Sequence, residues 1–169
     1  MLDYRNATDL GVLILRLCLG LTMAAHGANK IFGGGGIAGT ARWFDSIGMK
    51  PGVVHAWLAA LTEIGAGFCL AVGFLTPVVA GAFVALMLVA AWTVHRANGF
   101  FSANSGWEYN LILAVGALSA ATIGSGRFAL DSLLFGRDLC NGAVGFAAAL
   151  GIGLVGGIGQ LLIFYRPAK

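Results

Sequence analysis

Charged side chains are scarce in this sequence. Among its 169 residues, 10 are Lys or Arg and 7 are Asp or Glu, so charged residues make up only 10% of the chain. A soluble domain carries about 25% charged residues on average. Because 59% of this chain is hydrophobic, it has too little charge to cover a water-soluble fold. The composition therefore excludes intrinsic disorder and predicts an integral membrane protein.

Cysteine is also scarce, and its spacing carries no motif. Cys18, Cys69 and Cys140 lie far apart, without a C-x-x-C pair or the spacing of metal ligands. We therefore expect no metal site and no dithiol centre within the chain. Basic residues stand at the ends of apolar segments rather than along one face, which argues against a nucleic-acid partner.

Long apolar runs predict an all-α membrane protein with five spans. A membrane-crossing helix needs about 20 mostly apolar residues. Runs of this kind cover residues 10–28, 53–75, 77–97, 107–123 and 143–165. Two polar connections are expected to lie along the interface: a short helix with Thr40 as its N-cap, and the segment 127–141.

The last apolar run has a small residue at every fourth position. These residues share one helix face and form a ridge that lets another helix approach closely. The partner is either a helix of this chain or one of another subunit, and the sequence leaves both open. The ridge consists of Gly145, Ala149, Gly153 and Gly157.

Two charged residues lie inside the apolar runs. Arg16 precedes His26 by ten residues and Glu63 follows His55 by eight, which places them about 15 Å and about 12 Å below one membrane face. Because a lone charge at this depth costs several kcal/mol, we expect an Arg16–Glu63 ion pair. The pair either holds two helices together or forms a polar site for a ligand or proton.

Antiparallel threading gathers the histidines and tryptophans at one membrane face. Tryptophans at a membrane interface usually anchor a protein in the bilayer. Here, however, the histidines and tryptophans together lie beside further charged residues. Cations next to flat indoles suit a planar, electron-poor or anionic head group, with a quinone as one candidate. The Lys and Arg bias places this face in the cytoplasm. The gathered residues are His26, His55, His95, Trp43, Trp57, Trp92 and Trp107, with Lys30, Arg96 and Glu108. The candidate ligand-binding residues are Arg16, His26, Lys30, Glu63, Trp92, His95, Arg96, Trp107 and Glu108.

Several short segments resemble the DoxX family of small bacterial membrane proteins. The last of them is similar to the family's closing motif G-P-G-R-x-S-L-D, with Ser125 and Ala129 as departures. The resemblance covers roughly residues 10–135. The segments are Leu15–Gly20, His26-Gly27 with Lys30, Trp57–Gly67, Gly73–Thr76 and Gly124–Asp131.

The resemblance implies a fold, a location and a cellular role. It implies a four-helix transmembrane domain, which we place at residues 1–135. The fifth span, in an extension at 136–169, lies beyond the resemblance and is expected to be an added docking helix. One branch of the family includes a subunit of a thiosulfate:quinone oxidoreductase, and another is linked to oxidative-stress and thiol-defence assemblies. The chain is thus expected to be a multi-pass protein of the inner (plasma) membrane, in contact with lipid and with membrane or soluble redox proteins. Arg127 and Asp131, four residues apart, are expected to pair locally in a structural role.

We therefore expect a redox-associated bundle that binds a quinone-like or small anionic molecule, with its own catalysis left open. One alternative is a non-catalytic accessory subunit docked through the Gly145–Gly157 ridge. Another is a small-molecule permease that uses the Arg16–Glu63 polar centre.

Overall fold

The chain folds into helices joined by short connections. The computed structural model describes residues 4–136 and 141–167. The long helices are α1 (Tyr4–Phe32), α3 (Gly52–Val72), α4 (Thr76–Ala90), α5 (Glu108–Ile123) and α7 (Gly142–Phe164). The short helices are α2 (Gly36–Ser46) and α6 (Leu130–Leu134), and single turns η1 (Ala91–His95) and η2 (Arg96–Asn98) continue α4 before the turn η3 (Ser102–Asn104). The predicted all-α fold is confirmed.

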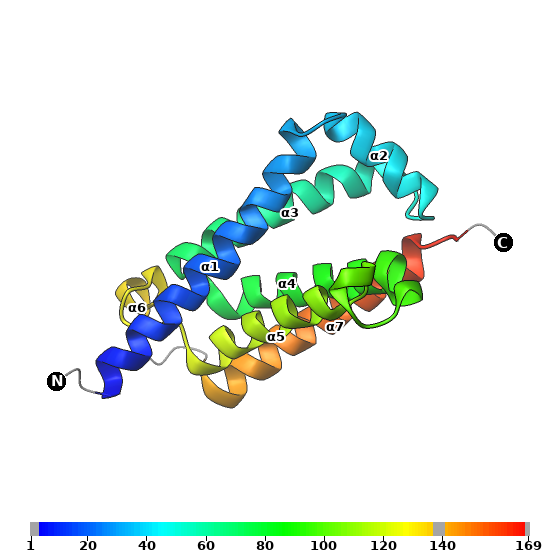
Figure 1. The fold of residues 1–169 in the computed structure, drawn as a ribbon. Coiled ribbons are helices and arrows are strands. Elements are labelled where there is room, and N and C mark those ends of the chain that lie inside the picture. The colour runs from blue at the N-terminus through cyan, green and yellow to red at the C-terminus, as the bar shows by residue number, and fades with distance from the viewer. Residues whose placement is uncertain (1–3, 137–140, 168–169) are drawn as a thin grey trace.

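The long helices run roughly side by side in two groups. In Figure 1, α1 and α3 lie together with α2 across their far end, while α4, α5 and α7 form the second group. The N-terminus and α6 lie at one end of the molecule, and α2 and the C-terminus lie at the other. The main core is built around Phe83 and Leu70, which are fully buried between the two groups.

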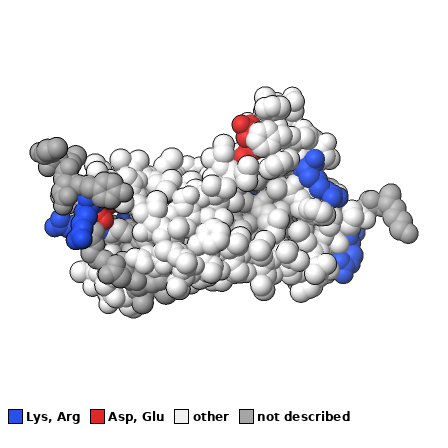
Figure 2. All heavy atoms as spheres, turned by 90° about the horizontal axis from the view of Figure 1, so that it is seen from below, with Lys and Arg blue, Asp and Glu red and all other residues white. Residues whose placement is uncertain are grey.

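Within residues 4–136 and 141–167, four helices are long and apolar enough to cross a bilayer. They cover Arg5–Phe32, Gly52–Val72, Thr76–Asn98 and Gly142–Phe164. The fourth predicted span forms α5, whose 16 residues extend about 24 Å, somewhat less than the usual core of a bilayer. On the face that Figure 2 displays, charged atoms lie at the left end and in the right half, and the broad stretch between them is uncharged, as suits a membrane-embedded molecule.

The first connection differs from the prediction. Helix α1 continues to Phe32, beyond the predicted end at residue 28. Helix α2 then begins at Gly36, preceded by Gly35 with a left-handed φ of 93°. Thr40 therefore lies inside α2, where its hydroxyl donates to the Gly36 carbonyl at 3.0 Å, and the predicted N-cap at Thr40 is wrong.

Helices α1 and α3 cross with their backbones almost in contact. A Cβ built on Gly67 would lie 2.6 Å from the Gly20 carbonyl oxygen, and one built on Gly20 would lie 2.7 Å from the backbone nitrogen of Ala71. No side chain other than hydrogen fits at either position without moving a backbone. The two glycines thereby fix which residues of α1 lie level with which residues of α3.

The small-residue ridge of α7 packs on α4 of the same chain. All of its four residues are buried. A Cβ on Gly153 would collide with Val84, and one on Gly157 would lie 2.8 Å from Leu88 Cδ2. The ridge is therefore covered within the chain, which is the first of the two alternatives that the sequence left open.

We expect Gly153→Ala to destabilise the protein relative to Gly151→Ala. Both changes remove a helical glycine from α7, which favours the helix by about 1 kcal/mol. Only the Cβ at position 153 meets α4, since a Cβ on Gly151 has nothing within 4 Å. Overpacking should then lower the free energy of unfolding of Gly153→Ala by about 1–3 kcal/mol relative to its control. Thermal melts in detergent would measure this, and equal stability of the two variants would contradict the intrachain packing.

Candidate functional site

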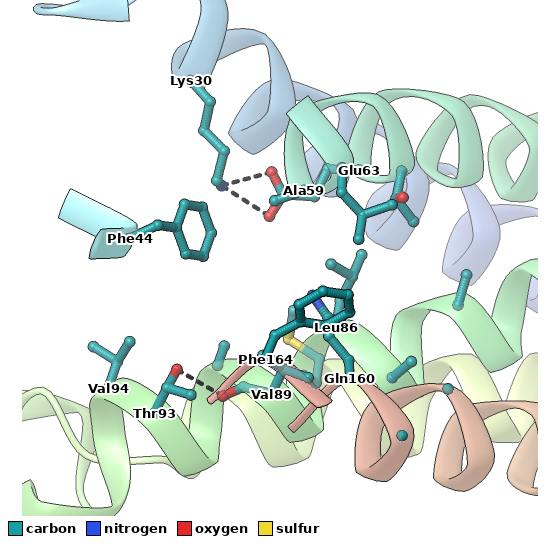
Figure 3. A pocket seen from close by; sticks show the side chains of 18 of the residues that line it. Lys30, Phe44, Ala59, Glu63, Leu86, Val89, Thr93, Val94, Gln160 and Phe164 are labelled. Atoms are coloured by element: carbon teal, nitrogen blue, oxygen red, sulfur yellow. Dashed lines mark hydrogen bonds and ion pairs between the residues drawn. The ribbon is translucent and has the colours of Figure 1, made fainter. Parts of the chain in front are cut away.

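A large cavity lies at the α2 end of the bundle, between α3, α4 and α7. Its volume is about 530 Å³, within the range of about 300–1,000 Å³ that is usual for small-molecule sites. Most of its wall is apolar, including Phe44 from α2 and Phe164 from α7. Figure 3 shows the polar groups that reach it, chiefly Lys30, Glu63 and Gln160.

Lys30 and Glu63 form an ion pair at the wall of this cavity. Lys30 Nζ lies 2.8 Å from Glu63 Oε1 and 2.6 Å from Oε2, as Figure 3 shows. The Glu63 residue is only 7% exposed. The pair is therefore largely removed from solvent, where an unpaired carboxylate would be costly. Sequence reasoning named both residues as site residues, but did not pair them.

The predicted Arg16–Glu63 ion pair is wrong. The prediction placed His26 and His55 level with each other, whereas α1 runs on to Phe32, six residues beyond His26. A Cβ on Gly27 would lie 2.9 Å from Glu63 Cβ, so Glu63 lies level with Gly27. Gly27 is eleven residues from Arg16, or roughly 17 Å along α1. Lys30 lies within reach of Glu63 and Arg16 does not.

Arg16 is instead fully buried at the opposite end of the bundle. Its guanidinium donates to the backbone carbonyls of Leu70, Ala71 and Phe128 at 3.4, 3.1 and 2.8 Å. Asp131 supplies a favourable charge nearby. Arg16 thus fastens the end of α3 to the segment that follows α5, and it takes no part in the cavity. The permease hypothesis loses the polar centre on which it depended.

Asp131 caps α4 rather than pairing with Arg127. Its carboxylate accepts from the backbone N–H groups of Leu75 at 2.7 Å and Thr76 at 2.9 Å. The guanidinium of Arg127 lies over the Phe128 ring, 5.9 Å from its centroid. The predicted local Arg127–Asp131 pair is wrong, because the first N–H groups of α4 occupy the carboxylate.

The charged and aromatic residues near the α4–α5 connection stay outside the cavity. Arg96 stacks on Trp92 with its guanidinium carbon 4.2 Å from the ring centroid, as an aromatic–basic patch. His95 Nδ1 donates to the Ser105 carbonyl at 2.6 Å. The Glu108 carboxylate accepts from the backbone N–H and the hydroxyl of Ser102, both at 2.9 Å. These contacts shape the connection itself.

Trp107 also belongs to this connection, where it packs edge-on against Phe100 with ring centroids 4.9 Å apart. Five residues of the predicted ligand site, namely Trp92, His95, Arg96, Trp107 and Glu108, thus lie apart from the cavity lining.

The three histidines do not converge. His26 Nε2 lies 3.4 Å from the Tyr109 hydroxyl, on the side of α1 that faces α5. His55 is buried, and its Nδ1 accepts from Gln160 Nε2 at 3.1 Å. His95 contacts Ser105. The three imidazole rings therefore have three different partners, Tyr109, Gln160 and Ser105. Among residues 4–136 and 141–167, no group of three or more His, Cys, Asp or Glu side chains is placed to hold a metal ion.

Sequence reasoning missed the contribution of α7 to the cavity. Gln160 lines the cavity and Phe164 packs on His55, with ring centroids 4.9 Å apart. The end of α7 is held there by two backbone hydrogen bonds, Arg166 N–H to the Gly48 carbonyl at 2.7 Å and Lys50 N–H to the Phe164 carbonyl at 3.2 Å. One signal was available, since Gln160 is the single amide in an otherwise apolar run.

Comparisons with known proteins agree with the sequence resemblance. The sequence model of the DoxX family matches residues 11–96. The chain is 32% identical over 127 residues to "Putative oxidoreductase CatD" of Bacillus subtilis (strain 168), covering 75% of this chain and 89% of that protein. It is 32% identical over 132 residues to "Inner membrane protein YqjF" of Escherichia coli (strain K12), covering 77% of this chain and 96% of that protein. No solved structure matches the chain significantly.

We expect Arg16→Lys to destabilise the protein, because an ammonium cannot reach three carbonyls in the fork geometry of a guanidinium. The loss of charge-assisted hydrogen bonds should lower the free energy of unfolding by about 1.5–3 kcal/mol. Arg5→Lys is the matched control, since Arg5 is exposed in the same helix. Melting temperatures of the two variants would measure the difference. Equal melting temperatures would contradict the proposal that Arg16 holds the end of α3 to the segment after α5.

We expect Lys30→Met to destabilise the protein by about 3 kcal/mol, because it leaves Glu63 buried without its partner. The double variant Lys30→Met/Glu63→Leu should recover most of this loss, since replacement of both partners is often close to neutral. A double-mutant cycle on unfolding in detergent would measure the coupling free energy. A coupling of zero would show that the pair contributes nothing to stability.

Proposed function

We propose a function from the premise that the chain belongs to the DoxX family of membrane proteins. In this proposal the protein has a redox-associated role in the inner membrane, and the cavity between α3, α4 and α7 binds a quinone-like molecule. The names of the two relatives, "Putative oxidoreductase CatD" and "Inner membrane protein YqjF", support a redox role and a membrane location.

The observation that carries the proposal is the polar pair on an apolar wall. Lys30 and Glu63 reach a cavity that is otherwise lined mainly by aliphatic and aromatic side chains. A quinone ring needs such walls for its faces and hydrogen-bond donors for its carbonyl oxygens. The Lys30 ammonium is one donor and the Gln160 amide is a second.

The same pair favours a neutral ligand over an anion. Lys30 Nζ is within hydrogen-bond distance of both oxygens of Glu63, so its charge is largely balanced inside the protein. A small anion would meet a neutral pair and would lose its hydration shell on entering an apolar cavity. Of the two ligand classes expected from the sequence, the quinone-like one is better supported.

The proposed role places the electron donor in a partner protein. The described lining residues include ammonium, carboxylate, amide and hydroxyl groups, but no thiol. We therefore propose that this chain holds and orients the quinone-like molecule while another protein exchanges electrons with it.

We expect the purified protein in lipid nanodiscs to bind a short-tailed benzoquinone, and Lys30→Met to weaken binding. Loss of one charge-assisted hydrogen bond, worth about 1.5–3 kcal/mol, corresponds to roughly 10- to 100-fold in Kd. Gln160→Leu should also weaken binding, by a smaller factor. Isothermal titration calorimetry would measure these constants.

Lys50→Met is the matched control, because Lys50 is exposed and does not line the cavity. Its Kd should equal that of the unaltered protein. If the unaltered protein does not bind the quinone, or if Lys30→Met binds it as tightly, the proposed function is wrong.

A further inference from the structure

The wall that α7 contributes to the cavity contains two positions without side chains. Gly156 and Gly159 both line the cavity. A Cβ built on Gly159 would have nothing within 4 Å, and one on Gly156 would meet only Ala85 Cβ, at 3.5 Å. These glycines differ from Gly153 and Gly157, whose missing side chains are required by the packing on α4. At Gly156 and Gly159 the missing side chains leave space.

The helix across from this wall is α3, and the two helices are separated there. Within the described residues, α3 packs on α1, α2 and α4, whereas it makes almost no backbone-level contact with α7. Leu58 of α3 and Ile163 of α7 both line the cavity, yet 46% and 62% of their surfaces are exposed. The cavity therefore reaches the outer surface of the molecule between α3 and α7.

This opening faces lipid. Its residues belong to two helices that are apolar enough to span a bilayer, Gly52–Val72 and Gly142–Phe164. Gly156 lies eight residues before the end of α7 at Phe164, which is about 12 Å along the helix axis. A molecule in the cavity thus has a sideways path into the hydrocarbon region.

We propose that the ligand carries a long apolar tail, which leaves the cavity between α3 and α7 while its polar head lies beside Lys30 and Glu63. This inference rests on the proposed function and narrows its ligand to a lipid-soluble quinone with an isoprenoid chain. The charged pair offers hydrogen bonds to the polar head. The opening lined by Gly156 and Gly159 gives a flexible hydrocarbon chain room to leave the cavity. Because such a chain is already dissolved in lipid, it gains nothing from removal of water, and the path is tested by blocking the opening.

The test compares two quinones that share one head group, one with a single isoprene unit and one with a long chain. Affinities are measured in nanodiscs by displacement, with each concentration expressed as a mole fraction of the lipid. Gly159→Phe places a ring in the opening, and we expect it to weaken the long-chain quinone at least about tenfold while the short one changes less than about twofold.

Gly151→Phe is the matched control. Gly151 lies on the same helix, its Cβ would also meet nothing within 4 Å, and it does not line the cavity. This variant should leave both affinities unchanged. Leu58→Trp narrows the same opening from α3 and should reproduce the selective loss, which keeps the test decisive if Gly159→Phe fails to fold.

The outcomes separate the two proposals. If the unaltered protein binds neither quinone, the proposed function fails. If it binds both quinones and the loss in Gly159→Phe is not selective for the long chain, the function stands and the tail path is overturned. Equal losses of both quinones in Gly159→Phe and Leu58→Trp, or no loss of either, overturn the tail path as well.

Discussion

The close crossing of α1 and α3 at Gly20 and Gly67 is the constraint on which the rest of the site depends. Because the two backbones touch there, the level of every residue on one helix is fixed relative to the other. That register brings Glu63 within reach of Lys30 and places Arg16 beside the carbonyls at the end of α3. Two buried charges therefore find different partners at opposite ends of the bundle. A shift of α1 by one helical turn, about 5.4 Å, would separate Lys30 from Glu63 and Arg16 from the carbonyls at the end of α3.

Much of the architecture was predictable, because it depends on properties that a linear sequence displays. Low charge and long apolar runs indicated a helical membrane protein, and the spacing of Gly153 and Gly157 indicated a close helix contact. The depth of Arg16 was misjudged because the end of α1 was placed at residue 28, and an error of a few residues at a helix end changes which side chains meet. The choice between Asp131 as a cap and as an ion-pair partner depends on the α3–α4 turn, which no local pattern encodes.

The candidate site was predicted only in part. Lys30 and Glu63 were identified from their charge and their depth, and they do line the cavity. Trp92, His95 and Arg96 were chosen because they lie at the same end, but proximity to a membrane face does not decide which way a side chain points. Gln160 was missed because a single amide in an apolar run is a weak signal. The division of the chain at residues 135 and 136 stays a prediction, although α7 packs along α4 and forms one wall of the cavity.

The way in which Arg16 is hydrogen-bonded has a consequence for the evolution of such proteins. Its three hydrogen-bond acceptors are main-chain carbonyls, which every amino acid supplies equally. The side chains at positions 70, 71 and 128 can therefore change under the demands of their own packing without removing a hydrogen-bond acceptor from the guanidinium. In an alignment of relatives, this arginine would then not covary with the three positions whose carbonyls accept its hydrogen bonds. A contact map inferred from correlated substitutions would therefore miss the contacts of Arg16 with these carbonyls. The same method could detect the Lys30–Glu63 pair, because both of its partners are side chains.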